Sequence, residues 1–164
     1  MAGALLGNAI HVTGGQEAPN AEEAMNTFWR LDLSRPEDKR SWEELEPIPG
    51  PARILPAAAA QNGDCYLASG ARLVPDDSGQ VTREYLTDAY CHEAKSMWRS
   101  IAASPHPVVA AAATAVGNSH VLVFDCRSHH VCLGSVPINN PTPRMALITD
   151  PNNTPTFAVL STSS

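Results

Sequence analysis

Gly63-Asp64-Cys65-Tyr66-Leu67-Ala68-Ser69-Gly70-Ala71 has a counterpart 56 residues earlier, Gly7-Asn8-Ala9-Ile10-His11-Val12-Thr13-Gly14-Gly15. The same offset aligns Asp32 with Asp88 and Trp42 with Trp98. A repeat at a fixed spacing of this size is typical of radial or stacked repeat proteins. We therefore interpret residues 63–105 as one structural unit that occurs twice.

The composition favours an all-β protein. The chain has 164 residues and is 43% hydrophobic, enough for the core of one domain. Its 14 prolines and 10 glycines suit many short strands joined by turns. A net charge of −6 without a run of Lys or Arg argues against nucleic-acid binding. The Ala-rich run 108–116 is too short for a membrane span, so we expect a buried strand there and no membrane partner.

The cysteines and the N-terminus give no sign of an exported protein. No CxxC pair occurs, so the cysteines are interpreted as free thiols: Cys65, Cys91, Cys126 and Cys132. Residues 1–7 lack a basic region, and their apolar run is too short for a signal peptide. The default expectation is therefore a cytoplasmic protein, and the periplasm is the alternative if the N-terminus is truncated.

The two units predict blades of four antiparallel strands. Residues 1–49 form a first blade with strands at 10–13, 27–33 and 42–45, whose inner strand is missing. Residues 50–105 form a second blade with an inner strand at 57–60 and further strands at 64–69, 85–90 and 98–101. Alanines suit a crowded inner strand; a short helix there is the alternative, but Pro56 and Asn62-Gly63 leave it little room. Four strands from the inside outward describe one blade of a β-propeller.

The C-terminal third of the chain departs from the repeat. Residues 106–137 begin like the other units, with an inner strand at 110–116. Pro137 follows Pro105 by only 32 residues, so about 24 residues of a full unit are absent. We therefore expect a shortened third blade. Residues 138–164 would start a fourth blade, with strands at 144–149 and 156–160.

These motifs resemble the kelch family, in which a strand ends in Gly-Gly and the outer strand carries a tryptophan. Four segments are similar to bacterial N-acetylneuraminate epimerases, the cyclically permuted mutarotases that interconvert anomers of sialic acid: 7–15, 28–33, 51–53 and 85–90. The resemblance implies a six-bladed propeller roughly twice as long as this chain, which would hold about three blades. It also implies an isomerase without a cofactor, because mutarotation needs only acid–base groups.

One departure concerns catalysis. The family's Gly-Glu-x-x-Pro-Gly-x-Arg-Thr stretch, which supplies its catalytic pair, has no counterpart in this sequence. The catalytic residues are therefore unknown, and we expect no activity from a chain of this length. The alternative is a non-enzymatic kelch module that binds a protein partner through its loop face. Open end faces of an incomplete ring also predict self-association.

Four charged residues are the candidates for contact with a sialic-acid-like sugar: Arg53, Arg72, Arg83 and Glu17. In a propeller, the outer-to-inner loop and the loop between the second and third strands leave the sheets on one face, which would place all four near one rim. An arginine can hold a sugar carboxylate through two parallel hydrogen bonds. The alternative is that all four are solvated loop charges.

The histidines and aromatic residues favour structural roles. His11 alternates within a buried strand and is expected to be packed rather than to act as a base. His129 and His130 are adjacent on a strand, so they point to opposite faces and predict no metal site. Trp29, Trp42 and Trp98 could stack a sugar, but two of them recur at the repeat spacing and are expected in the blade core. Tyr85 and Tyr90 have the same expectation.

Overall fold

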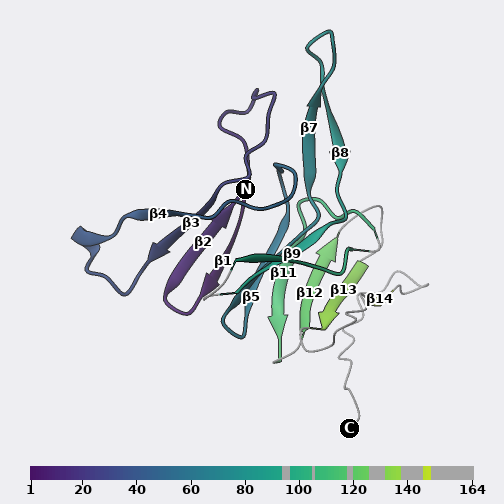
Figure 1. Ribbon diagram of the computed structural model, residues 1–164. Helices are drawn as coiled ribbons and strands as arrows, with labels where there is room; N and C mark the ends of the chain where they lie inside the picture. The colour runs from purple at the N-terminus through teal and green to yellow at the C-terminus, as the bar shows by residue number, and fades with distance from the viewer. Residues whose placement is uncertain (94–96, 105, 118–119, 126–131, 138–145, 149–164) are drawn as a thin grey trace.

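The computed structural model shows an all-β chain of three four-stranded sheets and one two-stranded hairpin (Figure 1). It describes residues 1–93, 97–104, 106–117, 120–125, 132–137 and 146–148. Within these ranges the helical structure is a single 3-10 turn, Glu37–Lys39. No helix of the described residues has the length and apolar character to cross a membrane. The predicted all-β class with four-stranded antiparallel sheets is confirmed.

The first sheet contains a strand that the sequence pattern did not predict. Its antiparallel order is β1 (Ala2–Leu6), β2 (Ala9–Thr13), β3 (Phe28–Asp32) and β4 (Trp42–Leu45). The expectation that the first blade lacks an inner strand is therefore wrong, because β1 fills that place. Gly7 has a φ of 57° and forms a tight turn with Asn8, which lets Leu6 pair with Ala9.

The second sheet has the order β10-β9-β6-β5. Its strands are β5 (Ala57–Gln61), β6 (Asp64–Ala68), β9 (Ala89–Glu93) and β10 (Trp98–Ile101). The hairpin of β7 (Ala71–Pro75) and β8 (Val81–Tyr85) is inserted between β6 and β9. The strand predicted at 85–90 is therefore misplaced, because Tyr85 ends β8 and residues 86–88 return the chain to the sheet. Asp32 lies in β3 and Asp88 in this connection, so their alignment is not structural.

The third sheet has four strands rather than a shortened set. It is ordered β11 (Ala112–Val116), β12 (His120–Asp125), β13 (Cys132–Pro137) and β14 (Ala146–Ile148). Its last strand pairs Leu133 with Ile148, and it comes from residues assigned to a fourth blade. The boundary at 137/138 is therefore wrong, because the chain returns to the same sheet after β13. The strand predicted at 156–160 and the His129-His130 pair lie outside the described residues.

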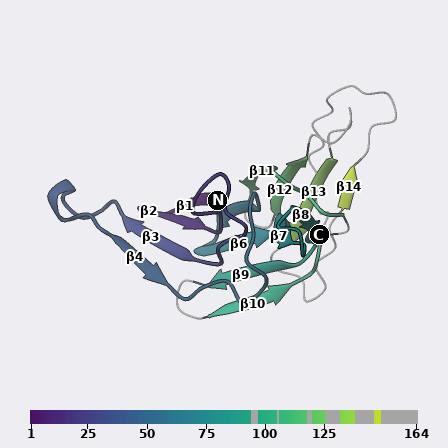
Figure 2. The same ribbon diagram turned by 90° about the horizontal axis from the view of Figure 1, so that it is seen from above.

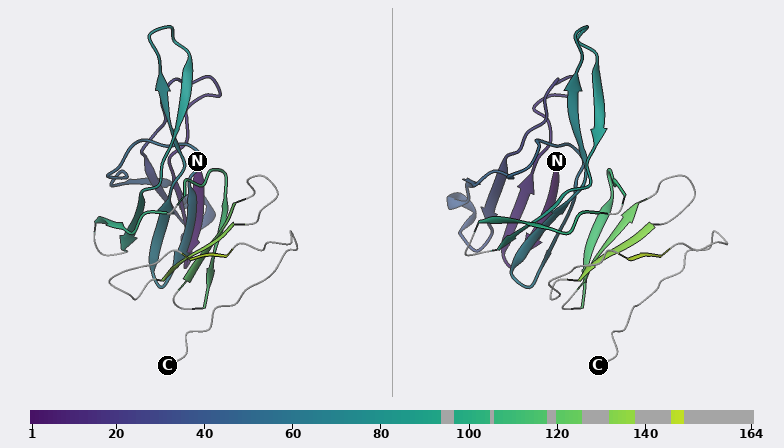
Figure 3. Two further views of the ribbon diagram at one scale, coloured as in Figure 1. Left: turned by 90° about the vertical axis from the view of Figure 1, so that its right-hand side faces the viewer. Right: turned by 45° about the vertical axis from the view of Figure 1, so that its right-hand side comes forward.

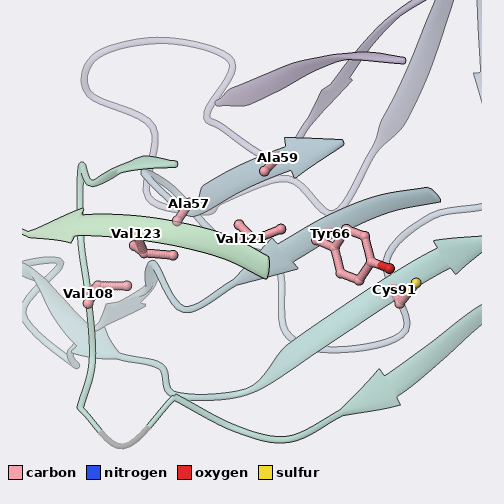
Figure 4. Close-up of a cluster of buried hydrophobic side chains, with 7 residues drawn as sticks. All are labelled: Ala57, Ala59, Tyr66, Cys91, Val108, Val121 and Val123. Atoms are coloured by element: carbon pink, nitrogen blue, oxygen red, sulfur yellow. The ribbon is translucent and has the colours of Figure 1, made fainter. Parts of the chain in front are cut away.

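The inner strands of the three sheets lie next to one another. β5 contacts both β1 and β11, and the view from above shows the sheets extending outward from these strands (Figure 2). The alanines of β5 leave room for this close approach, as the sequence predicted. One apolar cluster fills the space between the second and third sheets (Figure 4): Ala57, Ala59, Tyr66, Cys91, Val108, Val121 and Val123. Stacking of sheets through inner strands is the arrangement of blades in a propeller.

Aromatic side chains join the first sheet to the second. The ring centroids of Phe28 and Trp98 are 4.9 Å apart, and the Trp98 indole donates a hydrogen bond to the Glu46 carbonyl oxygen at 3.0 Å. Trp98 is half-buried and packs against a cluster of Ile48, Leu67 and Tyr90. Trp42 and Tyr85, both expected in the core, are 48% and 51% exposed instead. Recurrence at the repeat spacing predicted a core position for both tryptophans. The prediction is confirmed for Trp98 and wrong for Trp42.

Candidate functional site

Three long connections form one end of the molecule, which we call the loop face: residues 14–27, 46–56 and 69–88. The strand register places the ends that they join at the same edge of the sheets, since Thr13 pairs with Phe28 and Ala57 with Ala68. The first two connections are tied together by a hydrogen bond from the Gly15 amide to the Arg53 carbonyl oxygen at 2.8 Å. The expectation that these loops leave the sheets on one face is confirmed.

Arg53 is the central side chain of the loop face, and it is completely buried, with 0% of its surface exposed. Its Nη1 and Nη2 atoms donate to the two carboxylate oxygens of Asp88 at 2.9 and 2.6 Å. Further hydrogen bonds run to the carbonyl oxygens of Ser69 at 3.0 Å and Pro51 at 3.1 Å. These bonds occupy four of the five N–H groups of a guanidinium. Arg53 is therefore neither a solvated loop charge nor available to a ligand while this pair is closed.

Tyr90 completes this cluster. Its hydroxyl donates to Asp88 at 2.8 Å, and its ring lies 5.3 Å from the Arg53 guanidinium carbon. Partial burial acts to raise the pKa of Asp88, but the hydrogen bonds from Arg53 and Tyr90 and the positive charge of Arg53 outweigh it, so the pKa is lowered. Burial and the hydrogen bond to Asp88 raise the pKa of Tyr90. The cluster therefore holds a charged carboxylate and a neutral phenol.

Glycines let the loops close around this cluster. A side-chain carbon at Gly50 would lie 2.1 Å from the Tyr90 hydroxyl oxygen, and one at Gly14 would lie 2.6 Å from the Arg53 carbonyl oxygen. Gly14 also has a φ of 62°, which glycine adopts without strain. The Gly-Gly after β2 and the segment 51–53 are thus two halves of one structural contact. Two of the four segments of the family resemblance, 7–15 and 51–53, therefore serve the scaffold here.

The other candidate side chains are exposed, and the structure does not bring them together. Arg72 and Arg83 lie on the hairpin, which projects from the loop face (Figure 3). Arg72 pairs with Glu84 in the strand register and binds its carboxylate, with 2.8 Å between Nε and Oε2. Arg83 is opposite Leu73, the next position, so it points to the other face of the hairpin. Glu17 is exposed in the connection 14–27.

His11 lies at the interface of the first two sheets, as its packed interpretation predicted. It is buried and stacks on Phe28, with 5.5 Å between ring centroids. Burial and the nearby charge of Arg30 lower the pKa of His11. A buried, neutral imidazole between two sheets is not accessible to a ligand on the loop face. Among the described side chains, no group of three His, Cys, Asp or Glu residues could hold a metal ion.

Asp88 and Tyr90 were not predicted as partners of Arg53. A signal was present, because Arg53 is the single charge in the uncharged run 47–63. An arginine in such a run is buried only when a carboxylate pairs with it. The partner could not be chosen from the sequence, because 35 residues separate Arg53 from Asp88 and the hairpin lies between them.

Comparison with known proteins agrees with this fold. No family model matches the sequence, and no curated protein matches it. A solved structure titled "Structure of YjhT" matches with a TM-score of 0.71 and 13% identity over 88% of this chain. The match covers 44% of that chain, so this protein spans less than half the length of its structural neighbour. At this identity the similarity shows the fold alone, which is an all-β, propeller-like fold.

Proposed function

We propose that this chain is the part of a kelch-type propeller that contributes a loop face for a sialic-acid-like sugar, in a protein of the mutarotase type. The observation that supports the proposal is the resemblance of four segments to N-acetylneuraminate epimerases. The propeller-like fold agrees with that resemblance. The complete reaction would open and reclose the sugar ring and needs one proton donor and one proton acceptor. The stretch that supplies this pair in the family has no counterpart in this chain.

The loop face offers fewer groups to a sugar carboxylate than the sequence alone indicated. Arg53 would reach a ligand only by releasing Asp88, so its role is to hold the connections in place. Arg72 is about half exposed, and Glu84 already neutralises it. Arg83 is exposed on the other side of the hairpin. We therefore propose Arg83 as the contact of the carboxylate and Glu17 as a hydrogen-bond acceptor for hydroxyl groups. Arg72 stays paired with Glu84 on the opposite face of the hairpin.

Titration with N-acetylneuraminate, followed by amide NMR shifts of the whole chain, tests this proposal. We expect shifts at residues 14–27 and 71–85 and weaker binding after Arg83→Ala. Arg99→Ala is the matched control, because Arg99 is an exposed arginine on β10 that pairs with Glu93. Exchange spectroscopy between the sugar anomers should show no acceleration by this chain. Absence of shifts at millimolar sugar, or equal losses in both variants, would refute sugar binding at the loop face.

The hairpin favours a second candidate function, which is binding of a protein partner. It extends beyond the sheets and carries Tyr85 with 51% of its surface exposed (Figure 1). Exposed aromatic residues on a projecting element are frequent anchors at protein interfaces. Sugar titration separates the two functions: a protein-binding module should show no response to N-acetylneuraminate in either Arg83→Ala or the unchanged chain.

A further inference from the structure

The first sheet has an apolar face that no described strand covers. Its register places one residue of each strand in a single row across the sheet: Leu5, Ile10, Leu31 and Trp42. The neighbouring row on this face is Gly3, Val12, Trp29 and Glu44, in which Val12 and Trp29 are the large apolar side chains. Leu5 is 63% exposed and Trp42 is 48% exposed. We call these two rows the outer face of the first sheet.

The opposite face of the same sheet is the one that packs inside the molecule. Side chains alternate between the two faces along a strand. Phe28 and His11 therefore point away from the outer face, and Phe28 contacts Trp98 and His92 of the second sheet. Of the described strands outside the first sheet, β5 and β6 of the second sheet pack against it. The outer face is thus a second packing surface, of the kind that a propeller blade turns to its other neighbour.

The second sheet shows what such a surface does when a neighbour is present. Trp98 has the same place in the repeat as Trp42, and each lies at the start of the outermost strand of its sheet. Trp98 packs edge-on against Phe28 of the preceding sheet, with 4.9 Å between the ring centroids. Trp42 occupies the equivalent position on a sheet whose outer face is open. Trp42 is therefore exposed because no neighbouring sheet packs against it, whereas Trp98 has such a neighbour.

The third sheet also has a face that no described strand of another sheet covers. Val121 and Val123 are buried against the second sheet. By alternation along β12, Leu122 and Phe124 point to the other side of the third sheet, and both are half-buried. The first and third sheets thus present the two kinds of face that pack against each other between neighbouring sheets. The outer face of the first sheet corresponds to the Trp98 face of the second sheet, which packs on the first sheet. The Leu122 and Phe124 face corresponds to the Tyr66 face of the second sheet, which packs on the third sheet.

We propose that a second copy of this chain covers both open faces, so that two copies close one ring. The outer face of the first sheet in each copy packs on the Leu122 and Phe124 side of the third sheet in its partner. The chain matches 44% of the similar solved structure, so two copies supply most of the residues of a complete propeller of that size. Twofold symmetry makes both junctions identical and leaves no open end, so association stops at two. This inference does not depend on the proposed sugar.

Sedimentation equilibrium of the whole chain at several concentrations tests the two-copy ring. We expect a limiting mass of twice 17.4 kDa, with no larger species as concentration rises. Trp42→Glu should shift the dissociation constant at least tenfold towards the monomer, because a charge would enter the junction. Tyr85→Glu is the matched control: it changes an equally exposed aromatic residue away from the outer face and should leave the dissociation constant unchanged.

Each other result overturns the proposal. A monomer at every concentration would mean that something other than a second copy covers the outer face, and mass that keeps growing would mean an open chain of copies. Equal dimerisation of the Trp42→Glu and unchanged chains would place the contact elsewhere. Should Trp42→Glu lose its β-sheet circular dichroism, Leu5→Glu decides the question in the same assay, because Leu5 lies on the same row and is more exposed.

Discussion

Replacing Asp88 by Asn should destabilise the chain by about 3 kcal/mol, because it leaves the Arg53 guanidinium buried without a negative partner. Removing one partner of a buried ion pair costs about 3–5 kcal/mol. Arg53 is fully buried, whereas 30% of the Asp88 side chain is exposed to water. The lower end of that range applies, since solvent already stabilises part of the carboxylate charge. Asn retains one acceptor oxygen for Arg53 but not the charge.

Glu84→Gln is the matched control for this change. It breaks an arginine–carboxylate pair of the same chemistry on the hairpin, where the side chains of Arg72 and Glu84 are 45% and 53% exposed. Exposed pairs contribute about 0–1 kcal/mol, so this variant should remain close to the unchanged chain. Urea unfolding, followed by far-ultraviolet circular dichroism, measures the free energy of unfolding of both variants. With a slope of about 1–3 kcal/mol per molar, Asp88→Asn should lower the midpoint by about 1 M or more.

The pH dependence gives an independent check on the same pair. The pKa of Asp88 is lowered in the folded chain, so its stabilising effect is complete above the unfolded pKa of about 3.9 and is lost as pH falls through the folded value. The difference between the unchanged chain and Asp88→Asn should therefore be largest at neutral pH and shrink in acid. Equal midpoints for Asp88→Asn and Glu84→Gln at pH 7 would refute the structural role of Arg53.

Three further outcomes are expected from the packing between the sheets. Burial lowers the pKa of His11 and of His92, so the free energy of unfolding should fall as pH drops below about 6.5, and a double Asn variant should show a flatter profile between pH 7 and pH 5. Trp98→Ala should lower the free energy of unfolding by about 3 kcal/mol, because it removes a ring packed between two sheets. Trp42→Ala in the dilute chain should change it by no more than about 0.5 kcal/mol, so similar urea midpoints for the two variants would contradict this packing. Burial raises the pKa of the Cys65 thiol to about 12, so a thiol reagent should label Cys65 at neutral pH only after denaturant is added, as peptide mass spectrometry would show.

The sequence predicted those parts of the fold that depend on local pattern. The glycine-ended strand at 9–13 and the alanine strand at 57–61 were placed within one or two residues, because β-branched runs and small side chains bounded by glycine have one favourable backbone arrangement. Trp42–Leu45 was placed at its observed bounds. These elements carry their own turn signals, such as Asn62 and Gly63, which both have positive φ.

Parts that depend on contacts distant in sequence could not be predicted. The pattern predicts a loop where the hairpin of β7 and β8 lies, with only Tyr85 assigned to a strand, since a two-stranded insertion has no periodic signal within the repeat. Its return to the sheet is fixed by backbone hydrogen bonds from Leu86 to Gly70 and from Ser69 to Asp88, which no local pattern encodes. The same holds for the candidate site, where a loop position on the expected rim and a positive charge indicated that Arg53 contacts a ligand. The burial of Arg53 depends on Asp88 and Tyr90, which follow the hairpin in the sequence.

Amide hydrogen exchange of the dilute, monomeric chain should decide whether the second sheet is the packed centre of this fold. β6 (Asp64–Ala68) has a sheet neighbour on both sides and packed layers on both faces, whereas β2 (Ala9–Thr13) has one open face. We expect amides that are hydrogen-bonded in β6 to exchange at least about tenfold more slowly than those in β2, a difference of about 1.4 kcal/mol in opening free energy. Equal or greater protection of β2 would contradict the stacked order of the three sheets.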